Sequence, residues 1–323
     1  MERRNKFVKP TAYFIYALLL FLICEMAIRI IYPNRMLPLD ERNNLYQFDN
    51  RLGWFPKSNE DVNFKGSKTI KVKHNNFGFR DKEHGAKSKN RILFIGDSFT
   101  WGYDVEVGER FTNLLQEQIS NWEMLNLGVS GYGTDQAFVL LQDRFEHYSP
   151  DIVFLTFYNG NDRGENMSKV IYGGYYKPYF LLKDNEVKLS GVPVRKSYRY
   201  LFGKYPLLGK SRVLYIICRF IHELTKPDQL EKDPTEAIFI AMKKYIEERG
   251  SQLVIGFTDG NEEIEEAKWC MENNIQHLFL TNNFKYSSHG NHWTPEGHQF
   301  AFEKILTYLK TNQPQIFSDD NSQ

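Results

Sequence analysis

The sequence predicts an α/β protein: a parallel five-stranded sheet covered by helices on both faces, preceded by an N-terminal transmembrane helix. From Arg91 onward, short apolar segments alternate with amphipathic segments of helical period, which is the rhythm of repeated β–α–β units. Ahead of that region, residues 11–32 form an apolar run of about the ~20 residues that a helix needs to cross a bilayer. With 323 residues, of which 41% are hydrophobic, the chain is long enough to bury a substantial core.

The N-terminal run is interpreted as an uncleaved signal anchor. Four basic residues precede it: Arg3, Arg4, Lys6 and Lys9. Because basic flanks stay in the cytoplasm, residues 1–10 are expected inside and residue 33 onward outside, in the periplasm or the extracellular space. A cleaved signal peptide would need a small-residue cleavage site, which does not follow the run, and an in-plane amphipathic helix is the other alternative. Glu25 and Arg29 lie four residues apart and can pair on one helix face.

Residues 33–90 are polar and rich in turns, and we expect them to form a lead-in segment between the membrane and the catalytic core. The alternation in TIKVKH predicts a surface strand there. Residues 91–315 form the expected sandwich, and residues 316–323 are a polar tail. An insertion at about 163–233 is aromatic and basic and includes an expected Asp184-Asn185 turn; its aromatic rings can stack on sugars, lie on lipid headgroups or pack on the sheet.

Five apolar segments are the expected strands, and helical segments separate them. The strands are RILFIG, EMLNLGV, DIVFLTFY, QLVIGF and IQHLFL. The helices are GERFTNLLQEQIS, DQAFVLLQDRFEHY, PTEAIFIAMKKYIEERG, EEIEEAKWCMENN and PEGHQFAFEKILTYLK.

Charge and cysteine content exclude some classes of protein. Forty-one Lys and Arg against 40 Asp and Glu give a formal net charge of +1, so no global field favours nucleic acid as a partner. The three cysteines have no metal-ligand spacing. Buried thiols are the simple interpretation, and a Cys218–Cys270 disulfide is the alternative for an exported domain.

The residues with chemical potential fall at strand ends. Ligands of an open parallel sheet bind where the carboxyl ends of the strands, loops and helix N-termini converge. The first strand ends in GDSFTWG, so Ser98 lies at the turn into the next helix, among backbone N–H groups. Taken alone, a serine in that position is more often a helix cap.

Three further segments end at the same edge. NLGVSGYGTDQ follows the second strand, and Gly131 lets the backbone approach a substrate oxygen. YNGND follows the third strand, and the Asn161 amide can point to the same place, so that Ser98, Gly131 and Asn161 can surround one oxyanion. HGNHWTPEGH precedes the last helix, and His292 can act there as general base. We expect His298, in the first turn of that helix, to be structural.

The segments GDSFTWG, NLGVSGYG, YNGND and HWTPEGH, in this order, resemble the four blocks of the SGNH/GDSL hydrolase family over about residues 91–310. The LGW and NNFGFRD segments resemble the lead-in of membrane-anchored members. The resemblance implies a flavodoxin-like three-layer α/β/α sandwich. It also implies that Ser98 is the nucleophile, Gly131 and Asn161 complete the oxyanion hole, and His292 is the base.

The chain departs from this family at the acid. Members usually carry an aspartate two or three residues before the histidine, where this chain has Gly290 and His289. A Ser98–His292 dyad and a carboxylate recruited from another loop both stay open. Asp259, at the end of the fourth strand, is the best recruit, although an Asp-Gly turn is its simpler interpretation. Asn159 also replaces the usual third-block glycine.

The interpretation that results is a serine esterase acting on an acyl ester, for which O-acetyl groups of cell-surface or exported carbohydrate are the expected substrate, without metal or cofactor. An O-acetyltransferase would use the same site with a sugar hydroxyl as acceptor. A carbohydrate-binding or assembly protein with a degenerate triad is the alternative from another class, and the missing aspartate favours it.

Overall fold

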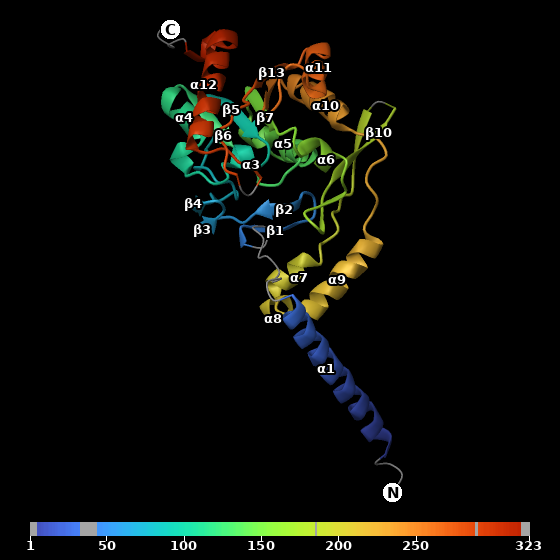
Figure 1. The fold of residues 1–323 in the computed structure, drawn as a ribbon. Coiled ribbons are helices and arrows are strands. Elements are labelled where there is room, and N and C mark those ends of the chain that lie inside the picture. The colour runs from blue at the N-terminus through green and yellow to red at the C-terminus, as the bar shows by residue number, and fades with distance from the viewer. Residues whose placement is uncertain (1–4, 33–43, 185, 288–289, 318–323) are drawn as a thin grey trace.

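A computed structural model describes residues 5–32, 44–184, 186–287 and 290–317 of the chain (Figure 1). Its centre is a five-stranded parallel sheet in the order β13-β12-β7-β5-β6. The strands are β5 (Asn90–Ile95), β6 (Trp122–Asn126), β7 (Ile152–Phe157), β12 (Gln252–Phe257) and β13 (Gln276–Phe279). When these five strands are numbered along the chain and read from the β6 edge, their order in the sheet is 2-1-3-4-5. This is the order of a doubly wound α/β sheet, and it confirms the predicted fold class.

Each central strand is apolar on both faces because helices cover both faces. On β5, Leu93 and Ile95 enter one core while Ile92 and Phe94 enter the other. The first core lies under α5 (Thr134–Tyr148), α10 (Thr235–Glu247) and α11 (Glu265–Glu272). The second lies under α4 (Phe111–Gln118) and α12 (Pro295–Asn312), which the short η2 (Pro314–Phe317) follows. The three layers of the sandwich follow from this alternation.

The lead-in segment packs on the sandwich as two antiparallel hairpins. They are β1 (Tyr46–Asp49) with β2 (Gly53–Pro56), and β3 (Asp61–Lys65) with β4 (Thr69–Lys73). Strand β4 is the one predicted from TIKVKH, with Ile70 and Val72 buried and its other residues exposed. Trp54 accepts a 2.6 Å hydrogen bond from the Tyr132 hydroxyl at its carbonyl, so the hairpins are joined to the sandwich directly.

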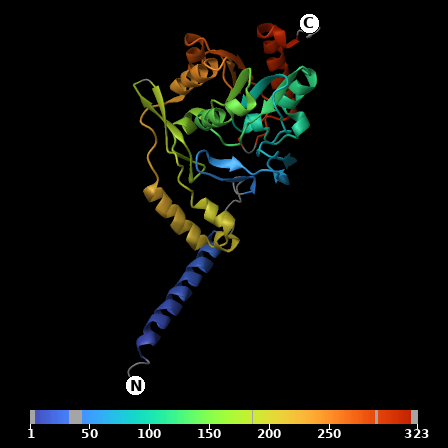
Figure 2. The same cartoon turned by 180° about the vertical axis from the view of Figure 1, so that it is seen from behind.

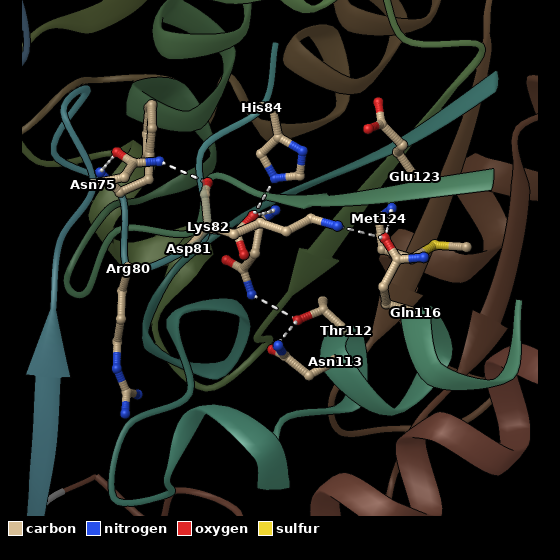
Figure 3. A network of polar contacts seen from close by, with 12 residues as sticks. Asn75, Arg80, Asp81, Lys82, His84, Thr112, Asn113, Gln116, Glu123 and Met124 are labelled. Atoms are coloured by element: carbon tan, nitrogen blue, oxygen red, sulfur yellow. Dashed lines mark hydrogen bonds and ion pairs between the residues drawn. The ribbon is translucent and has the colours of Figure 1, made fainter. Parts of the chain in front are cut away.

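A polar network holds the end of the lead-in against β6 and α4 (Figure 3). The Asp81 carboxylate accepts hydrogen bonds from the Asn126 backbone N–H at 2.8 Å and from His84 Nε2 at 2.9 Å. The Asn126 side chain then donates to the carbonyl of Thr100 at 2.7 Å. Because Thr100 lies in the short helix α3 (Ser98–Trp101), the network connects the lead-in to the segment that carries Ser98.

The insertion forms small hairpins and three helices outside the sandwich. The strands are β8 (Val170–Ile171), β9 (Tyr175–Tyr176), β10 (Tyr179–Lys183) and β11 (Glu186–Ser190), and the helices are α7 (Arg199–Lys204), α8 (Pro206–Gly209) and α9 (Arg212–Thr225). Lys183 pairs with Glu186, which agrees with a turn at Asp184; Asn185 lies outside the described residues. The cysteines are free: Cys270 is buried in the core, and Cys218 lies on α9. The Cys218–Cys270 disulfide considered from the sequence is therefore not formed.

The first helix, α1 (Asn5–Ile31), projects from the rest of the molecule at the end opposite α12 (Figures 1 and 2). Its segment Pro10–Ile31 has a mean hydropathy of 2.3 and is 6% buried, and it is long and apolar enough to cross a membrane. Helices α7, α8 and α9 gather around its inner end (Figure 1). Glu25 and Arg29 form the expected i,i+4 ion pair at 2.7 Å.

Candidate active site

Ser98 lies where β5 turns into α3, at the carboxyl edge of the sheet. β5 has β6 on one side and β7 on the other, so this is the point where the strand order reverses and where open α/β sheets bind ligands. Asp97 lies two residues after the end of β5 and caps α3, accepting a 2.9 Å hydrogen bond from the Phe99 N–H. The cap is thus Asp97, and Ser98 occupies the first helical position with 8% of its surface exposed.

His292 meets Ser98 from the loop between β13 and α12. Its Nε2 lies 2.8 Å from Ser98 Oγ, a hydrogen-bonding distance between residues 194 positions apart. The His292 carbonyl accepts from the Tyr286 N–H at 2.9 Å, and the next residue, Trp293, is fully buried against Phe99. The loop is therefore held on both sides of the base.

An aromatic ring orients the base. Tyr103 stacks on His292 with ring centroids 4.2 Å apart and planes inclined by 23°. Phe64 of β3 packs edge-on against Tyr103 at 5.2 Å, so a lead-in strand supports the stacked pair. Sequence reasoning missed Tyr103, because no periodicity or motif indicates that an aromatic residue after α3 lies on a histidine 189 positions later.

The two other oxyanion candidates lie at the ends of β6 and β7. Gly131 has φ +81°, a backbone conformation that favours glycine, in the turn between β6 and α5. Asn161 begins the short helix α6 (Asp162–Asn166), and its amide Nδ2 donates to Glu165 Oε1 at 3.2 Å. A side-chain amide has two N–H donors, so the second can serve an oxyanion.

Comparisons with known proteins found a curated relative and solved structures, all of low sequence identity to this chain. No family model matches the chain. An arylesterase of Vibrio mimicus is 22% identical over 160 residues, covering 46% of this chain and 80% of the relative. Among solved structures, the psychrotrophic esterase EstA from Pseudoalteromonas is 12% identical with a TM-score of 0.41, covering 70% of this chain and 100% of EstA. The acetyl xylan esterase AlAXEase is 12% identical with a TM-score of 0.40, covering 68% of this chain and 99% of that chain.

Three of the four segments follow the neighbouring strands β5, β6 and β7, the fourth follows the edge strand β13, and the first and last of them meet through Ser98 and His292. The positions of these segments and the contact between Ser98 and His292 agree with the arrangement that the resemblance to the SGNH/GDSL hydrolases implies.

Two buried carboxyl groups, Asp97 and Asp162, lie at this edge of the sheet. Asp97 lies behind Ser98, and Asp162 follows Asn161 and accepts a 3.0 Å hydrogen bond from the Tyr158 N–H. Burial raises the pKa of Asp97 to about 7. Burial and repulsion from Asp97 raise the pKa of Asp162 well above its ordinary value. Burial therefore favours the protonated form of both carboxyl groups.

Asp259 lies at the same edge but contacts the loop that follows β7. Its Oδ1 accepts a 2.8 Å hydrogen bond from the Asn159 N–H, in the loop that leads to Asn161. The structure thus places this carboxylate on the oxyanion loop rather than on His292. Burial raises its pKa, and the Asn159 hydrogen bond partly opposes that rise.

The SGNH/GDSL family usually carries its acid at the positions that His289 and Gly290 occupy in this chain. His289 lies outside the described residues. Gly290 has φ +87°, and a Cβ there would lie 3.0 Å from His292 Cε1. A side chain at 290 would therefore require both an unfavourable backbone conformation and a shift of the base.

Proposed function

We propose that this chain is a membrane-anchored, extracytoplasmic esterase that removes acyl groups, in the first place O-acetyl groups, from cell-surface or exported carbohydrate. The observation that carries the proposal is the 2.8 Å contact of Ser98 Oγ with His292 Nε2 at the carboxyl edge of the sheet. A nucleophile hydrogen-bonded to its base is the arrangement that acyl transfer requires.

In the proposed reaction, Ser98 Oγ attacks the ester carbonyl carbon as its proton passes to His292 Nε2. The carbonyl oxygen becomes an oxyanion that the Ser98 N–H, the Gly131 N–H and the Asn161 amide stabilise, each by about 3 kcal/mol. Collapse of this intermediate breaks the ester C–O bond, and His292 returns the proton to the leaving alcohol. Water then attacks the acyl-enzyme in the same way and releases the acid.

Ser98 and His292 carry out the proton transfers in this proposal, with the imidazole oriented by Tyr103. A ring stacked at 4.2 Å restricts imidazole rotation, and its π-face favours the imidazolium that forms during the attack. Asp259 then acts as a positioning residue that fixes the Asn159 backbone ahead of Asn161.

Carbohydrate as the substrate class comes from the family resemblance and from an aromatic residue beside the site. Tyr172 of the insertion is 38% exposed, and its hydroxyl donates to Glu165 Oε1 at 2.7 Å. Glu165 in turn holds the Asn161 amide. An exposed aromatic ring next to an oxyanion loop suits stacking on a sugar.

The anchor is supported by α1. Its apolar side chains are exposed all around the helix, as with Tyr13 at 72% and Ile23 at 64%, which in water would be unfavourable. The basic flank before residue 11 places its N-terminus in the cytoplasm, so the esterase domain would be outside.

A fluorophosphonate probe tests the nucleophile. We expect it to label the wild type and a Ser120→Ala control, in which an exposed serine is removed, but not Ser98→Ala. Labelling that persists in Ser98→Ala would contradict the assignment. Hydrolysis of a chromogenic acetyl ester with and without a sugar acceptor then separates esterase from acetyltransferase, and no turnover in either assay would favour a binding protein.

The variant Asp259→Asn tests whether Asp259 is the acid that orients His292. Asparagine keeps the oxygen that accepts from the Asn159 N–H, so the dyad mechanism expects a change in turnover below about threefold. Loss of a true triad aspartate costs about 10⁴. A fall of tenfold or more in a folded Asp259→Asn variant would make Asp259 the acid, whereas higher activity in His289→Asp would support the dyad.

A further inference from the structure

Helix α9 presents an exposed apolar stripe. Ile216, Ile217, Phe220, Ile221 and Leu224 are between 46% and 70% exposed. Their spacing of one, four, five and eight residues places them on one face of the helix. The opposite face is held by the insertion: His222 is buried, with its ring 5.7 Å from that of Tyr176 and 5.4 Å from that of Tyr198.

The N-terminus of α9 is fixed to the end of α1. Glu25 accepts hydrogen bonds from the backbone N–H groups of Arg212 at 3.1 Å and Val213 at 3.0 Å. The Ser211 hydroxyl also donates to Glu25, at 3.0 Å. A carboxylate at a helix N-terminus satisfies free N–H groups and interacts favourably with the helix dipole.

Arg29 and Arg212 add further contacts across this junction. Arg29 donates to the Lys210 carbonyl at 2.5 Å, and Arg212 donates to the carbonyl of Tyr32. These bonds involve residues 25–32, the last part of the Pro10–Ile31 span. Helix α9 therefore starts at the level where α1 would leave the membrane, and both views show it diverging from α1 (Figures 1 and 2).

We propose that α9 lies in the plane of the membrane–water interface, on the extracytoplasmic side of the membrane that α1 spans. Its apolar stripe then lies at the boundary between headgroups and acyl chains. This inference rests on the proposed membrane span of α1. Continuity with that span identifies the occupant as lipid: a stripe that starts beside the emerging helix meets the bilayer first. Basic residues flank the stripe, as is usual for interfacial helices that contact anionic headgroups: Lys210, Arg212, Arg219 and Lys226.

The neighbouring helices continue the same surface. Leu201 and Tyr205 at the α7 end and Leu208 of α8 are between 42% and 49% exposed. Tyrosine and leucine at this level suit a membrane interface, where one end of a side chain is apolar and the other is hydrated. Two attachments, α1 and α9, would fix the orientation of the esterase domain over the bilayer rather than leave it on a single tether.

The test uses the full-length protein in vesicles that contain phosphatidylglycerol and phosphatidylcholine. Cys24 and Cys218 are replaced by serine, Cys270 is buried, and an environment-sensitive fluorophore is attached at Phe220→Cys. The matched control is Arg219→Cys, the adjacent exposed residue outside the stripe. We expect blue-shifted emission at position 220, and quenching by a lipid with a nitroxide near its carbonyl groups that is about twofold or more stronger than at 219.

Equal quenching at the two positions would overturn the proposal. Emission at 220 that shifts only as the protein-to-lipid ratio rises, without nitroxide quenching, would also overturn it and assign the stripe to a second copy of the chain. Extraction of the vesicles with alkaline carbonate reports separately on α1: release of the wild type would refute the span itself. None of these measurements depends on ester hydrolysis by Ser98. Failure of the catalytic proposal can therefore be distinguished from failure of the α9 proposal and from failure of the α1 span.

Discussion

At the scale of residues, the candidate active site consists of Ser98 and His292 and of the side chains that pack against them. His292 lies between rings, with Tyr103 stacked at 4.2 Å and Phe99 tilted at 5.5 Å. Ser98 lies against Asp97, whose nearer oxygen is 3.4 Å from Ser98 Oγ. These neighbours limit rotation of the base and place a carboxyl group of altered pKa beside the nucleophile.

Replacing Tyr103 tests the stacking. In Tyr103→Leu we expect kcat/KM to fall about 3- to 30-fold, because a cation–π contact contributes about 0.5 to 2 kcal/mol. The acid limb of the pH–rate profile should also move to lower pH, since the imidazolium loses its stabilising ring. Tyr103→Phe keeps the ring and should restore both properties. An unchanged pH profile in Tyr103→Leu would assign Tyr103 a purely structural role.

The buried Asp97 predicts how stability depends on pH. Its pKa is about 7 in the folded protein and 3.8 ordinarily, so between these values the folded state holds a proton that the unfolded state has released. Stability should therefore fall as pH rises from about 4 to about 7 and stay lowered above that. Asp97→Asn keeps the acceptor for the Phe99 N–H but does not titrate.

Thermal unfolding from about pH 5 to pH 9 measures this effect. Asp97→Asn should lose less of its Tm than the wild type as pH rises, and should be the more stable of the two above about pH 8. Asp61→Asn, a change at a half-exposed carboxylate of β3, is the control. Parallel Tm curves for wild type and Asp97→Asn would show that Asp97 does not titrate in this range.

At the scale of elements, the lead-in hairpins are joined to the sandwich beside the candidate active site. Arg80 is 1% exposed and follows the second hairpin. Its guanidinium donates to the carbonyls of Gly102 at 2.7 Å and Val105 at 2.8 Å, the turn that carries Tyr103. It also donates to the Lys71 carbonyl of β4 at 3.1 Å. One side chain thus joins the hairpin to the loop that orients the base.

Arg80→Met should destabilise the protein by about 2 to 4 kcal/mol, because it leaves several buried carbonyl oxygens without a donor. Lys82→Met, which removes an exposed ammonium two residues later, should cost less than about 0.5 kcal/mol. Denaturant unfolding of both variants measures the difference. If Arg80→Met unfolds at the wild-type midpoint, the lead-in is an accessory of the sandwich rather than part of it.

At the scale of the whole molecule, α1 projects from one end and α12 lies at the other (Figure 1). Helix α3, which carries Ser98, lies on the side of the sandwich that faces β1 to β4 (Figure 1). The nucleophile is therefore on the side of the sandwich that bears the lead-in. This arrangement gives the chain a defined polarity relative to the proposed membrane.

A C-terminal reporter that works only outside the cytoplasm tests this polarity. We expect activity from the full-length fusion because the basic flank of α1 stays inside. Removing that charge by changing its Lys and Arg residues to Gln is the matched comparison and should lower reporter activity. An inactive reporter on an intact wild-type fusion would reverse the orientation.

The sequence by itself determined the sandwich and the chemical groups of its edge. Strands such as RILFIG are apolar along their whole length, and period 3.6 marks the helices between them, so the β–α–β order could be predicted locally. Ser98, Gly131, Asn161 and His292 could be proposed as site residues because each follows a strand, and parallel strands direct their carboxyl ends to one edge.

Only the tertiary structure decided what surrounds these groups. The stack of Tyr103 on His292, the Arg80 contacts with Gly102 and Val105, and the Glu25 cap of α9 join residues 22 to 189 positions apart. Local propensity carries no record of such contacts, because they arise when separate elements pack and bury polar atoms that must then find donors or acceptors. The placement of Asp259 on the oxyanion loop and the absence of the Cys218–Cys270 bond were decided at the same level.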